Sequence, residues 1–334
     1  MDLDNDQWLA PFKGKKILVT GGAGFFASHL TKKLHRAGAE VYVLTKYKSI
    51  IDNIRLVKIW DDIHPVEADL RNTDSLTQIK DIAPEIVFHF AAYNHVGDSF
   101  LHVAESMQSN AVGTANVMEA YEGYEKFVYI DTSEAYGYQE SVPFTETQIP
   151  FPTSPYAVGK YAGELYAQMK HHVTKQPIVM LRPFNVFGPY QSPKAIIAEI
   201  IIKCLRGEEI RSTEGIQTRD FNYVENLVDG VLMSALEDKC IGQVMNIGSG
   251  VEITIKDLIL KIHELTNSDS KLSIGALPYR PTEIWRMQAD NQRATEILGW
   301  TPKVSLDEGL SLSIDWYRKF IDVYYGEDSG LVSL

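Results

Sequence analysis

The feature that most constrains the fold is a short apolar run that leads into a glycine-rich turn near the N-terminus. Residues 16–20 read Lys-Ile-Leu-Val-Thr, a run with β-branched members that is typical of a buried strand. Gly-Gly-Ala-Gly-Phe-Phe-Ala follows at 21–27, and a helical pattern continues to about residue 37. This order predicts a dinucleotide-binding loop, because glycine permits a tight turn and lets the backbone approach a pyrophosphate. A plain strand-to-helix turn is the alternative, and the strand context favours the functional interpretation.

Four residues of this turn are candidate contacts for the dinucleotide. The pyrophosphate would sit at the helix N-terminus, against Gly21, Gly24, Phe25 and Phe26. Ala27 stands where a third small residue would let the helix and the strand pack closely.

The end of the next strand indicates which dinucleotide is bound. A dinucleotide fingerprint expects an acidic residue about 20 positions after the glycines, hydrogen-bonded to the adenine ribose. Here the strand at 41–44 ends in Thr-Lys-Tyr-Lys-Ser, without a carboxylate. The Thr45 hydroxyl and the Lys46 and Lys48 ammonium groups suit a 2′-phosphate better than a free 2′-hydroxyl. We therefore predict NADP in preference to NAD, with solvated loop charges as the alternative interpretation of the lysines.

Strand patterns alternate with helical patterns along the first half of the chain. Strands are expected near residues 16–20, 40–44, 66–69, 86–90, 127–131 and 178–182, and helices near 25–37, 73–82, 98–122 and 155–173. This rhythm predicts an α/β fold with a Rossmann-type, doubly wound parallel sheet covered on both faces. The second half is less regular, with helices expected near 195–206, 225–236, 254–265, 290–298 and 306–323 and a strand at 244–247. We expect it to form a smaller, mixed α/β domain, and residues 1–13 to form an arm on the surface.

A tyrosine and a lysine on one expected helix are candidate catalytic residues. Tyr156 and Lys160 are four positions apart, which places them on one helix face. A free phenol has a pKa near 10, and a neighbouring ammonium favours the phenolate. A phenol whose pKa is lowered toward neutrality can exchange a proton with a sugar or alcohol hydroxyl. A chance pair on an exposed helix is the alternative.

Hydroxyl and carboxyl groups follow the strand expected at 127–131. Thr132, Ser133 and Glu134 come directly after this apolar run. Ligands bind at the carboxyl ends of the strands in open parallel sheets. We therefore expect these three side chains to face the site that the helix of Tyr156 also borders, rather than to form a simple polar turn.

Composition and charge narrow the class of protein. A net charge of −12 argues against a nucleic-acid partner, and no apolar run is long enough to span a membrane. Cys204 and Cys240 lie in apolar helical stretches, so we expect buried thiols and a reducing, cytoplasmic location. The first residues are acidic, unlike a signal peptide. The nine histidines show no metal-binding spacing, and we predict no metal.

Taken together, these segments resemble the extended short-chain dehydrogenase/reductase family, in particular its nucleotide-sugar branch of epimerases, 4,6-dehydratases and decarboxylases. The resemblance covers nearly the whole chain. It includes four further motifs, at residues 88–96 (Phe-His-Phe-Ala-Ala-Tyr-Asn-His-Val), 110–114 (Asn-Ala-Val-Gly-Thr), 182–189 (Arg-Pro-Phe-Asn-Val-Phe-Gly-Pro) and 219–224 (Arg-Asp-Phe-Asn-Tyr-Val).

The resemblance implies further site residues. Asp69 and Leu70 would flank the adenine of the cofactor, and Ala91 and Ala92 would line its channel. The substrate would be a nucleotide-diphosphate sugar, whose negative charges need local cations. The candidates by resemblance are Asn185, Lys194, Arg219 and Arg286. His95 follows a strand end near this site, so it is either a substrate contact or a solvated or core histidine.

The resemblance also implies a domain arrangement and an oligomeric state. Residues 1–181 would form the dinucleotide-binding domain, to which segments around 218–250 return, and residues 182–334 would mainly bind substrate. The helices expected at 98–122 and 155–173 carry more apolar residues than one sheet face would bury. Members of the family pair these helices across a two-fold axis, so a homodimer is expected.

The function that the resemblance favours is a nucleotide-sugar 4,6-dehydratase. Tyr156 would remove the 4-hydroxyl proton while the cofactor takes a hydride from C4, Lys160 would hold the phenolate, and Thr132 would hydrogen-bond the reacting oxygen. Glu134 would remove the C5 proton. Many related dehydratases have an aspartic acid where this chain has Ser133, so Glu134 would also pass its proton to the leaving C6 oxygen. The alternatives are a uronic acid decarboxylase, a 4-epimerase, which needs no base at C5, and a non-catalytic dinucleotide sensor, which typically lacks the tyrosine or the lysine.

Overall fold

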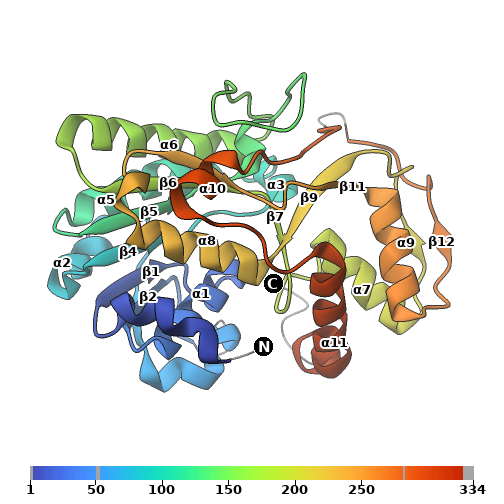
Figure 1. Cartoon of the computed structure of the whole chain (residues 1–334), viewed down its shortest axis with the longest axis horizontal. Helices are drawn as coiled ribbons and strands as arrows, with labels where there is room; N and C mark the ends of the chain where they lie inside the picture. Colours follow the sequence, from blue (N-terminus) through green and yellow to red (C-terminus); the bar gives the residue numbers. More distant parts are fainter. Residues whose placement is uncertain (1–2, 50–52, 281–282, 326–334) are drawn as a thin grey trace.

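A seven-stranded parallel sheet forms the centre of the computed structural model, which describes residues 3–49, 53–280 and 283–325 (Figure 1). From one edge to the other the strands are β10 (Val244–Ile247), β6 (Ile178–Pro183), β5 (Lys126–Ile130), β4 (Ile86–His89), β1 (Lys16–Thr20), β2 (Glu40–Thr45) and β3 (His64–Glu67). The chain runs outward from β1 to β2 and β3, and then returns to the other side of β1 with β4. The carboxyl ends of β1 and β4 therefore border a topological switch point, where ligands bind in folds of this kind. The predicted doubly wound sheet is confirmed.

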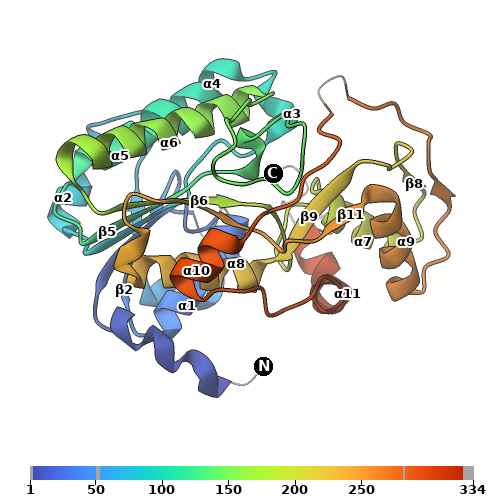
Figure 2. The same cartoon turned by 45° about the horizontal axis from the view of Figure 1, so that its top comes forward.

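Both faces of the sheet are buried, each in its own hydrophobic core. Successive side chains of a strand point to opposite faces and therefore enter different cores. Ile17 and Val19 belong to one hydrophobic core, and Leu18 between them belongs to the other. Figure 2 shows α4, α5 and α6 above the sheet and α1 and α8 below it. The bounds of these helices and of α2 at the edge are α1 (Phe25–Arg36), α2 (Gln78–Ile82), α4 (Val103–Met107), α5 (Gly113–Ala120), α6 (Pro155–Thr174) and α8 (Val224–Leu236).

The long helix expected at 98–122 is broken into several segments, and this expectation was wrong. The structure has α3 (Val96–Ser99), α4, a π-helical segment at Gln108–Val112, and α5. Within the π-helical segment, the Asn110 side chain accepts a hydrogen bond from Tyr93 N (2.7 Å) and donates one to Tyr93 O (3.0 Å). Gly159 of α6 packs against Asn110 so closely that a Cβ there would lie 3.0 Å from the Asn110 Cβ. The widened turn thus fixes the loop after β4 to the helical layer.

The C-terminal part contains shorter strands and further helices beside the main sheet. The first group is β7 (Asn185–Phe187), β9 (Thr218–Tyr223) and β11 (Glu252–Thr254), and the second is β8 (Ile210–Arg211) and β12 (Leu272–Ser273). The helices are α7 (Ile196–Arg206), α9 (Ile255–Thr266), α10 (Gln292–Leu298) and α11 (Leu306–Tyr325). Sequence patterns predicted all four helices but none of these strands. Four of the strands have only two or three residues and carry no detectable period, whereas the six-residue strand β9 was noted only as a motif.

The two parts of the fold share a buried carboxylate. Asp220 of β9 accepts hydrogen bonds from the backbone N–H groups of Ser249, Gly250 and Ala289, at 2.7, 2.9 and 3.0 Å. Ser249 lies just beyond β10, which pairs with β6 in the main sheet. Asp220 therefore joins the sheet edge to the shorter strands. The division expected at residue 182 falls inside β6 and stays a prediction.

The N-terminal segment is more deeply packed than a surface arm. It contains a 3₁₀ helix, η1 (Leu3–Phe12), whose Leu9 and Phe12 side chains are buried in the main core. Cys204 and Cys240 are both buried and free. Among the described helices, none is both long and apolar enough to cross a membrane.

Candidate active site

The glycine turn lies at the switch point, directly against the strand end after β4. Gly21 donates a hydrogen bond to Leu44 O (2.8 Å) and accepts one from Gly24 N (2.8 Å). Gly21 has a φ of +66°, and a Cβ on it would lie 2.8 Å from Ala91 Cα. Only glycine fits this conformation and this contact without strain. Gly24 then caps the N-terminus of α1, so the helix starts at the edge of the crevice.

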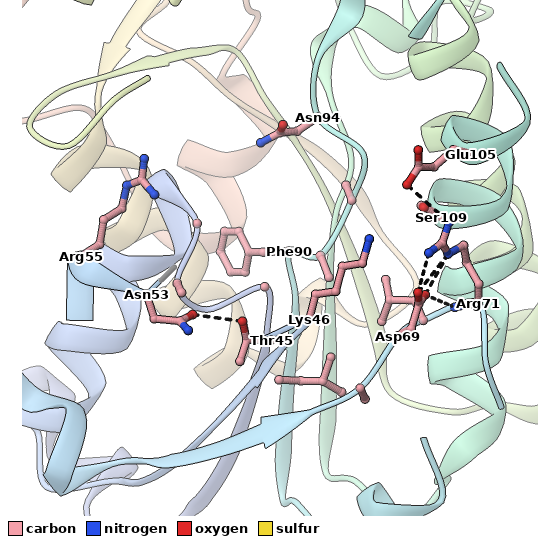
Figure 3. Close-up of a pocket in the computed structure, with 18 residues that line it drawn as sticks. Thr45, Lys46, Asn53, Arg55, Asp69, Arg71, Phe90, Asn94, Glu105 and Ser109 are labelled. Carbon is pink, nitrogen blue, oxygen red and sulfur yellow. Dashed lines mark hydrogen bonds and ion pairs between the residues drawn. The ribbon is translucent and has the colours of Figure 1, made fainter. Parts of the chain in front are cut away.

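A cavity of about 350 Å³ extends from this turn along the ends of β2, β3 and β4 (Figure 3). Of the predicted cofactor contacts, its lining includes Gly21, Gly24, Thr45, Lys46, Asp69, Leu70, Ala91 and Ala92. Figure 3 shows the Lys46 side chain between Phe90 and Asp69. Lys48 is exposed and is not part of this lining. The cavity therefore has the position and the lining that a dinucleotide needs, with a lysine where the ribose acid is usually found.

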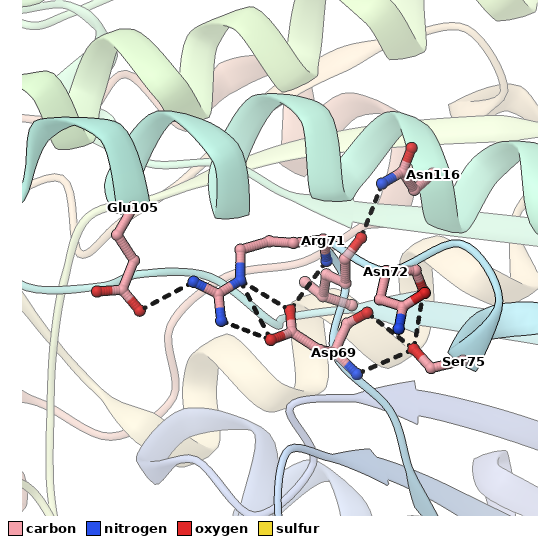
Figure 4. A network of polar contacts seen from close by, with 7 residues as sticks. Asp69, Arg71, Asn72, Ser75, Glu105 and Asn116 are labelled. Carbon is pink, nitrogen blue, oxygen red and sulfur yellow. Dashed lines mark hydrogen bonds and ion pairs between the residues drawn. The ribbon is translucent and has the colours of Figure 1, made fainter.

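The loop after β3 is fixed by a network of charges around Asp69 (Figure 4). Asp69 Oδ1 accepts hydrogen bonds from Arg71 N and from Arg71 Nε, each at 2.9 Å, and Arg71 also reaches Glu105 at 3.3 Å. The hydrogen bond from Arg71 lowers the pKa of Asp69 to about 2. Leu70 O accepts a hydrogen bond from Asn116 of α5 at 2.8 Å. These contacts hold Asp69 in place in the lining of the cavity, and Arg71 is paired with two carboxylates.

The predicted catalytic residues converge on a second cavity of about 350 Å³, which shares Gly21 and Gly24 with the first. Its lining includes all five catalytic candidates, namely Thr132, Ser133, Glu134, Tyr156 and Lys160, together with Phe25 and Phe26 of α1. The loop after β5 and the first turns of α6 supply the five side chains. Ser154 caps α6 by accepting a hydrogen bond from Ala157 N at 3.1 Å, and Pro155 occupies the first turn, which fixes where Tyr156 points.

The electrostatic environment of Tyr156 differs from the sequence expectation. Burial raises the pKa of Tyr156 above its ordinary value, and a hydrogen bond with Thr132 partly opposes this shift. Lys160 is not among the groups that shift it. The Lys160 ammonium instead donates to Ile130 O at 2.5 Å and lies 4.4 Å from the centre of the Tyr129 ring. The pKa of Tyr156 is therefore raised, where a lowered pKa was expected, because burial is the largest influence on it.

Glu134 lies at the junction of two cavities. It lines the cavity of Tyr156 and also an adjoining cavity of about 470 Å³ whose lining includes Arg219 and Arg280. Burial raises the pKa of Glu134, while the charges of Arg219 and Arg280 oppose the shift. Ser133 is buried beside it and donates a hydrogen bond to Met287 Sδ at 3.5 Å. A buried carboxyl group that lines the same cavity as Tyr156 can give or take a proton there, which makes Glu134 a candidate acid–base group.

The predicted substrate contacts are only partly brought together. A larger cavity of about 700 Å³ includes His95, Asn185 and Lys194 in its lining. Arg219 lines the cavity that it shares with Glu134 and forms an ion pair with Glu283 at 2.6 Å. Arg286 is outside these cavities: it pairs with Glu252, and 59% of its side chain is exposed. His95 accepts a hydrogen bond from Asp98 N at 3.0 Å and so caps α3 at the rim.

Sequence reasoning missed two arginines of the site. Arg280 lines the 700 Å³ cavity and the cavity of Glu134, although Arg286, six residues later, was nominated. Arg55 lines both the first cavity and the 700 Å³ cavity, and its Nε donates to Tyr190 O at 3.0 Å. Arg280 stands beside a proline that could have marked the turn, whereas Arg55 lies in the 3₁₀ helix η2 (Ile54–Asp62), for which the sequence analysis expected no element. The described residues contain no group of three or more His, Cys, Asp or Glu side chains placed to hold a metal ion.

Comparison with a family model and a curated relative agrees with this geometry. Residues 18–312 match the family model described as GDP-mannose 4,6 dehydratase. A dTDP-D-glucose 4,6-dehydratase of Mus musculus is 33% identical over 325 residues, which cover 91% of this chain and 89% of the relative.

Solved structures with similar folds include epimerases. An epimerase of Methanothermobacter thermautotrophicus has a TM-score of 0.89 at 30% identity, and the match covers 97% of this chain and 98% of that one. A UDP-glucuronic acid 4-epimerase of Bacillus cereus, solved with UDP-glucuronic acid and NAD, has a TM-score of 0.83 at 30% identity over 91% of this chain and 99% of that one. Dehydratases and epimerases are thus similarly close to this chain.

The contact between Gly21 and Ala91 can be tested by substitution. Gly21→Ala would force the strand end after β4 outward, so we expect dinucleotide affinity to fall by about tenfold or more, equivalent to roughly 1.4 kcal/mol. Gly14→Ala is the matched control, because Gly14 also has a positive φ, +74°, but nothing lies within 4 Å of its added Cβ. Titration calorimetry with NADP and NAD would measure both variants. An equal loss of affinity in both would contradict the role given to the close contact.

Proposed function

Because the chain belongs to the extended short-chain dehydrogenase/reductase family of nucleotide-sugar epimerases and dehydratases, we propose that it is a nucleotide-sugar 4,6-dehydratase. It would convert a nucleotide-diphosphate hexose into the 4-keto-6-deoxy sugar and water. We place the reaction in the cytoplasm, where free thiols such as those of Cys204 and Cys240 stay reduced.

The observation that carries this proposal is the position of Glu134. Its carboxyl group lines the same cavity as Tyr156 and Lys160, and burial raises its pKa. An exchange of configuration at C4 needs one acid–base group for the 4-hydroxyl and none at C5. Elimination of water across C5 and C6 requires a base at C5. A second titrating group in the cavity therefore favours the dehydratase over the 4-epimerase.

Tyr156, Thr132 and Lys160 each have a role in the first half of the reaction, the oxidation at C4. When bound, the oxidised dinucleotide supplies reversible hydride transfer, first from C4 of the sugar and then back to C6. Tyr156 takes the proton of the 4-hydroxyl, and Thr132, which hydrogen-bonds Tyr156, orients that hydroxyl. Lys160 lines the same cavity, and we assign to its positive charge the stabilisation of the phenolate that Tyr156 forms during the reaction, against the burial that raises the pKa of Tyr156.

Glu134 performs the second half of the reaction. The 4-ketone acidifies the C5 proton, which Glu134 removes. The C6–O bond then breaks, the proton from Glu134 leaves with the C6 hydroxyl as water, and a C5–C6 double bond forms. Ser133 is too weak an acid to protonate the leaving group, and its hydroxyl is engaged with Met287. Once C6 has been reduced, Glu134 returns a solvent-derived proton to C5.

Cations around the larger cavities would hold the diphosphate. Lys194, Arg280 and Asn185 line the 700 Å³ cavity, and Arg219 lines the cavity of Glu134, which Arg280 also lines. The pairing of Arg219 with Glu283 neutralises part of its charge, so Arg280 and Lys194 are the stronger candidates.

Incubation with a panel of UDP-, GDP-, CDP- and dTDP-sugars, read by mass spectrometry, tests the reaction class. A loss of water supports the dehydratase. A loss of carbon dioxide from a uronic acid would identify a decarboxylase, and a change of configuration without a change of mass would identify an epimerase. Either of the last two results would overturn the proposal.

Replacement of Glu134 by glutamine tests its role. Glu134→Gln keeps the shape and removes the base, so water loss should fall by about 10²-fold or more. In deuterated water the wild type should place deuterium at C5, and the variant should do so far more slowly. Tyr156→Phe serves as the comparison, because it should abolish the reaction before C5 exchange can begin. Undiminished water loss in Glu134→Gln would disprove the assigned role.

We further propose that the cofactor is NADP. Lys46 and Thr45 line the first cavity at the end of β2, and no carboxylate of this strand end competes with a 2′-phosphate. Thr45 donates a hydrogen bond to Asn53 Oδ1 at 3.0 Å, which orders this side of the cavity. Asp69, an acid that also lines this cavity, is already bound to Arg71. Similar proteins have been solved with NAD, which is the alternative.

The preference should depend on Lys46. Lys46→Gln should lower the affinity for NADP by about tenfold while changing the affinity for NAD much less, because one phosphate–ammonium contact is lost. Lys48→Gln removes the same charge two residues away, outside the cavity lining, and is the matched comparison. Thermal shift and calorimetry with each dinucleotide would measure the difference. Tighter binding of NAD by the wild type would contradict the proposal.

We also propose that two copies associate through the helical layer of α4 and α6. One side of α6 exposes Val158, Leu165, Met169 and Val173, and Val103 and Val112 are exposed on the neighbouring segments. Figure 2 shows α4 and α6 together on the outer side of the sheet. An apolar face of this extent fits an interface between two copies better than contact with water.

The helical layer can be tested by introducing charge. A double substitution, Leu165→Asp and Met169→Asp, should convert a dimer into a monomer, because it places four carboxylates at a two-fold interface. Leu260→Asp, on α9, is the control, since Leu260 is a similarly exposed helical leucine elsewhere on the molecule. Light scattering at micromolar concentration would report the mass. A monomeric wild type would refute the proposed interface.

A further inference from the structure

Lys160 is held at both its backbone and its side chain by one residue of the sheet, Tyr129. Tyr129 belongs to β5 and is fully buried. Its hydroxyl donates a hydrogen bond to Lys160 O at 2.7 Å. The ring of the same tyrosine lies beneath the Lys160 ammonium, whose nitrogen is 4.4 Å from the ring centre. One side chain of β5 therefore contacts both ends of a residue of α6.

Two glycines of α6 make this close approach possible. A Cβ on Gly163 would lie 2.6 Å from the Tyr129 hydroxyl. Any larger residue there would push the hydroxyl away from Lys160 O or move α6 away from the sheet. Gly159, four residues earlier on the same helix face, approaches the neighbouring segment in the same way, since its Cβ would lie 3.0 Å from Asn110 Cβ. The glycines thus let α6 come near enough to β5 for Tyr129 to reach Lys160.

The Tyr129 ring is a favourable partner for a buried ammonium. Lys160 is only 2% exposed, and its ammonium donates a hydrogen bond to Ile130 O at 2.5 Å. A cation over the face of an aromatic ring is attracted by the negative charge of that face, most strongly where the cation is desolvated. Burial lowers the pKa of Lys160 to about 8, so the ring favours the charged form against this effect.

The charged neighbours of Lys160 are largely tied to one another. Arg182 of β6 donates two hydrogen bonds to Glu164 of α6, at 2.8 and 2.6 Å, and lies 3.8 Å from Asp131, which follows β5. On α6, burial raises the pKa of Tyr156, so its phenol is neutral before the reaction. The contacts that the Lys160 ammonium itself makes are those with Ile130 O and with the Tyr129 ring.

His89 of β4 packs against the Tyr129 ring without adding a positive charge. The two rings are stacked, with their centroids 5.9 Å apart. Thr114 Oγ1 donates to Asn110 O at 2.7 Å, so it accepts from His89 Nε2, 3.0 Å away. A neutral imidazole satisfies this arrangement, because Nδ1 then accepts from Thr20 Oγ1 at 2.7 Å. Burial lowers the pKa of His89 to about 3, in agreement with the neutral form.

We propose that Tyr129 is a positioning residue whose ring supports the Lys160 ammonium and whose hydroxyl fixes the turn of α6 from which Lys160 extends. The inference rests on the proposed function in that it uses the role assigned to Lys160 in stabilising the phenolate of Tyr156. Tyr129 is not part of the lining of the catalytic cavity, whereas Lys160 is. Tyr129 therefore acts through Lys160 and not on the substrate.

Two substitutions separate the hydroxyl from the ring. Tyr129→Phe keeps the ring, so kcat should fall only about threefold, as for one lost neutral hydrogen bond, and the alkaline limb of the rate profile should not move. Tyr129→Leu also removes the ring, so the pKa of Lys160 should fall by about one unit. Because Lys160 acts in its charged form, the alkaline limb should then move to lower pH by the same interval.

The two variants are compared at two pH values. Relative to Tyr129→Phe, Tyr129→Leu should be about fivefold slower at about pH 8 and nearly as fast at about pH 6. An equal loss at both pH values would indicate a merely structural role and overturn the proposal, as would an alkaline limb that stays in place.

A series of fluorinated rings tests the ring without changing its shape. Phenylalanines with one, two and three ring fluorines at position 129 progressively remove the negative charge of the ring face. The alkaline limb should move stepwise to lower pH along this series, which keeps the test available if Tyr129→Leu folds poorly. An unmoved limb across the whole series would contradict the role given to the ring.

Tyr124 provides the matched control. It is 4% exposed in the same hydrophobic core, and its hydroxyl bonds Gln176, beyond the far end of α6 from Lys160. Tyr124→Phe and Tyr124→Leu remove the same groups as the variants of Tyr129. Both should leave the alkaline limb in place, and a limb that moves equally in Tyr124→Leu would overturn the assignment to Tyr129.

Direct titration of Lys160 separates this inference from the proposed reaction. NMR of isotope-labelled lysine side chains in the full-length protein reports the protonation of each ammonium, and Lys160→Arg identifies the Lys160 signal by its loss. The titration midpoint should fall by about one unit from Tyr129→Phe to Tyr129→Leu. If no sugar of the panel reacts but the midpoint falls, the proposed reaction fails and the support that Tyr129 gives to Lys160 stands. If the sugar reacts and neither the midpoint nor the limb moves, the role of Tyr129 fails alone.

Discussion

The close contact between the turn after β1 and the strand end after β4 is the constraint on which the rest of the site depends. Gly21 can approach Ala91 only because it lacks a Cβ and adopts a positive φ. Because of this contact, backbone atoms of Gly21 and Ala91 form part of the floor of the crevice at the switch point. The loop after β4 is held from its other side by Asn110, and through it by α6, which carries Tyr156 and Lys160. The cofactor cavity and the catalytic cavity are therefore positioned by one set of packed elements.

Burial then determines how the catalytic groups titrate. It raises the pKa of Tyr156 and of Glu134 and lowers that of Lys160, so each group is shifted toward its neutral form. The chain offsets this effect with a few placed groups: Arg219 and Arg280 near Glu134, and the Tyr129 ring beside Lys160. An acidic protein can in this way bind an anionic substrate, because the charges next to the cavity matter more than the net charge.

Much of the fold could be predicted because it depends on local patterns. The strands from residue 16 to 183 and the helices that cover them follow apolar periodicities that survive in the structure. The breaks in the helix expected at 98–122 could not be predicted. Asn110 in its π-helical segment is hydrogen-bonded to Tyr93, which lies outside the helix and 17 residues earlier in the chain, so no local sequence pattern indicates this contact. The short strands β8 and β12 exist only because they pair with each other. Neither has a sequence period of its own.

The candidate site shows the same division. The glycine turn, the Tyr156–Lys160 pair and the Thr132–Glu134 cluster were identified from the amino-acid sequence because strand ends and helix faces determine their direction. Tertiary structure decided which arginines reach the cavities: Arg280 does and Arg286 does not, although both belong to one irregular segment whose path depends on packing. It also decided the sign of the pKa shift at Tyr156. The residue types and their order are local properties of the chain, whereas desolvation and counter-charges are properties of the assembled core, where residues far apart in sequence share one dry environment.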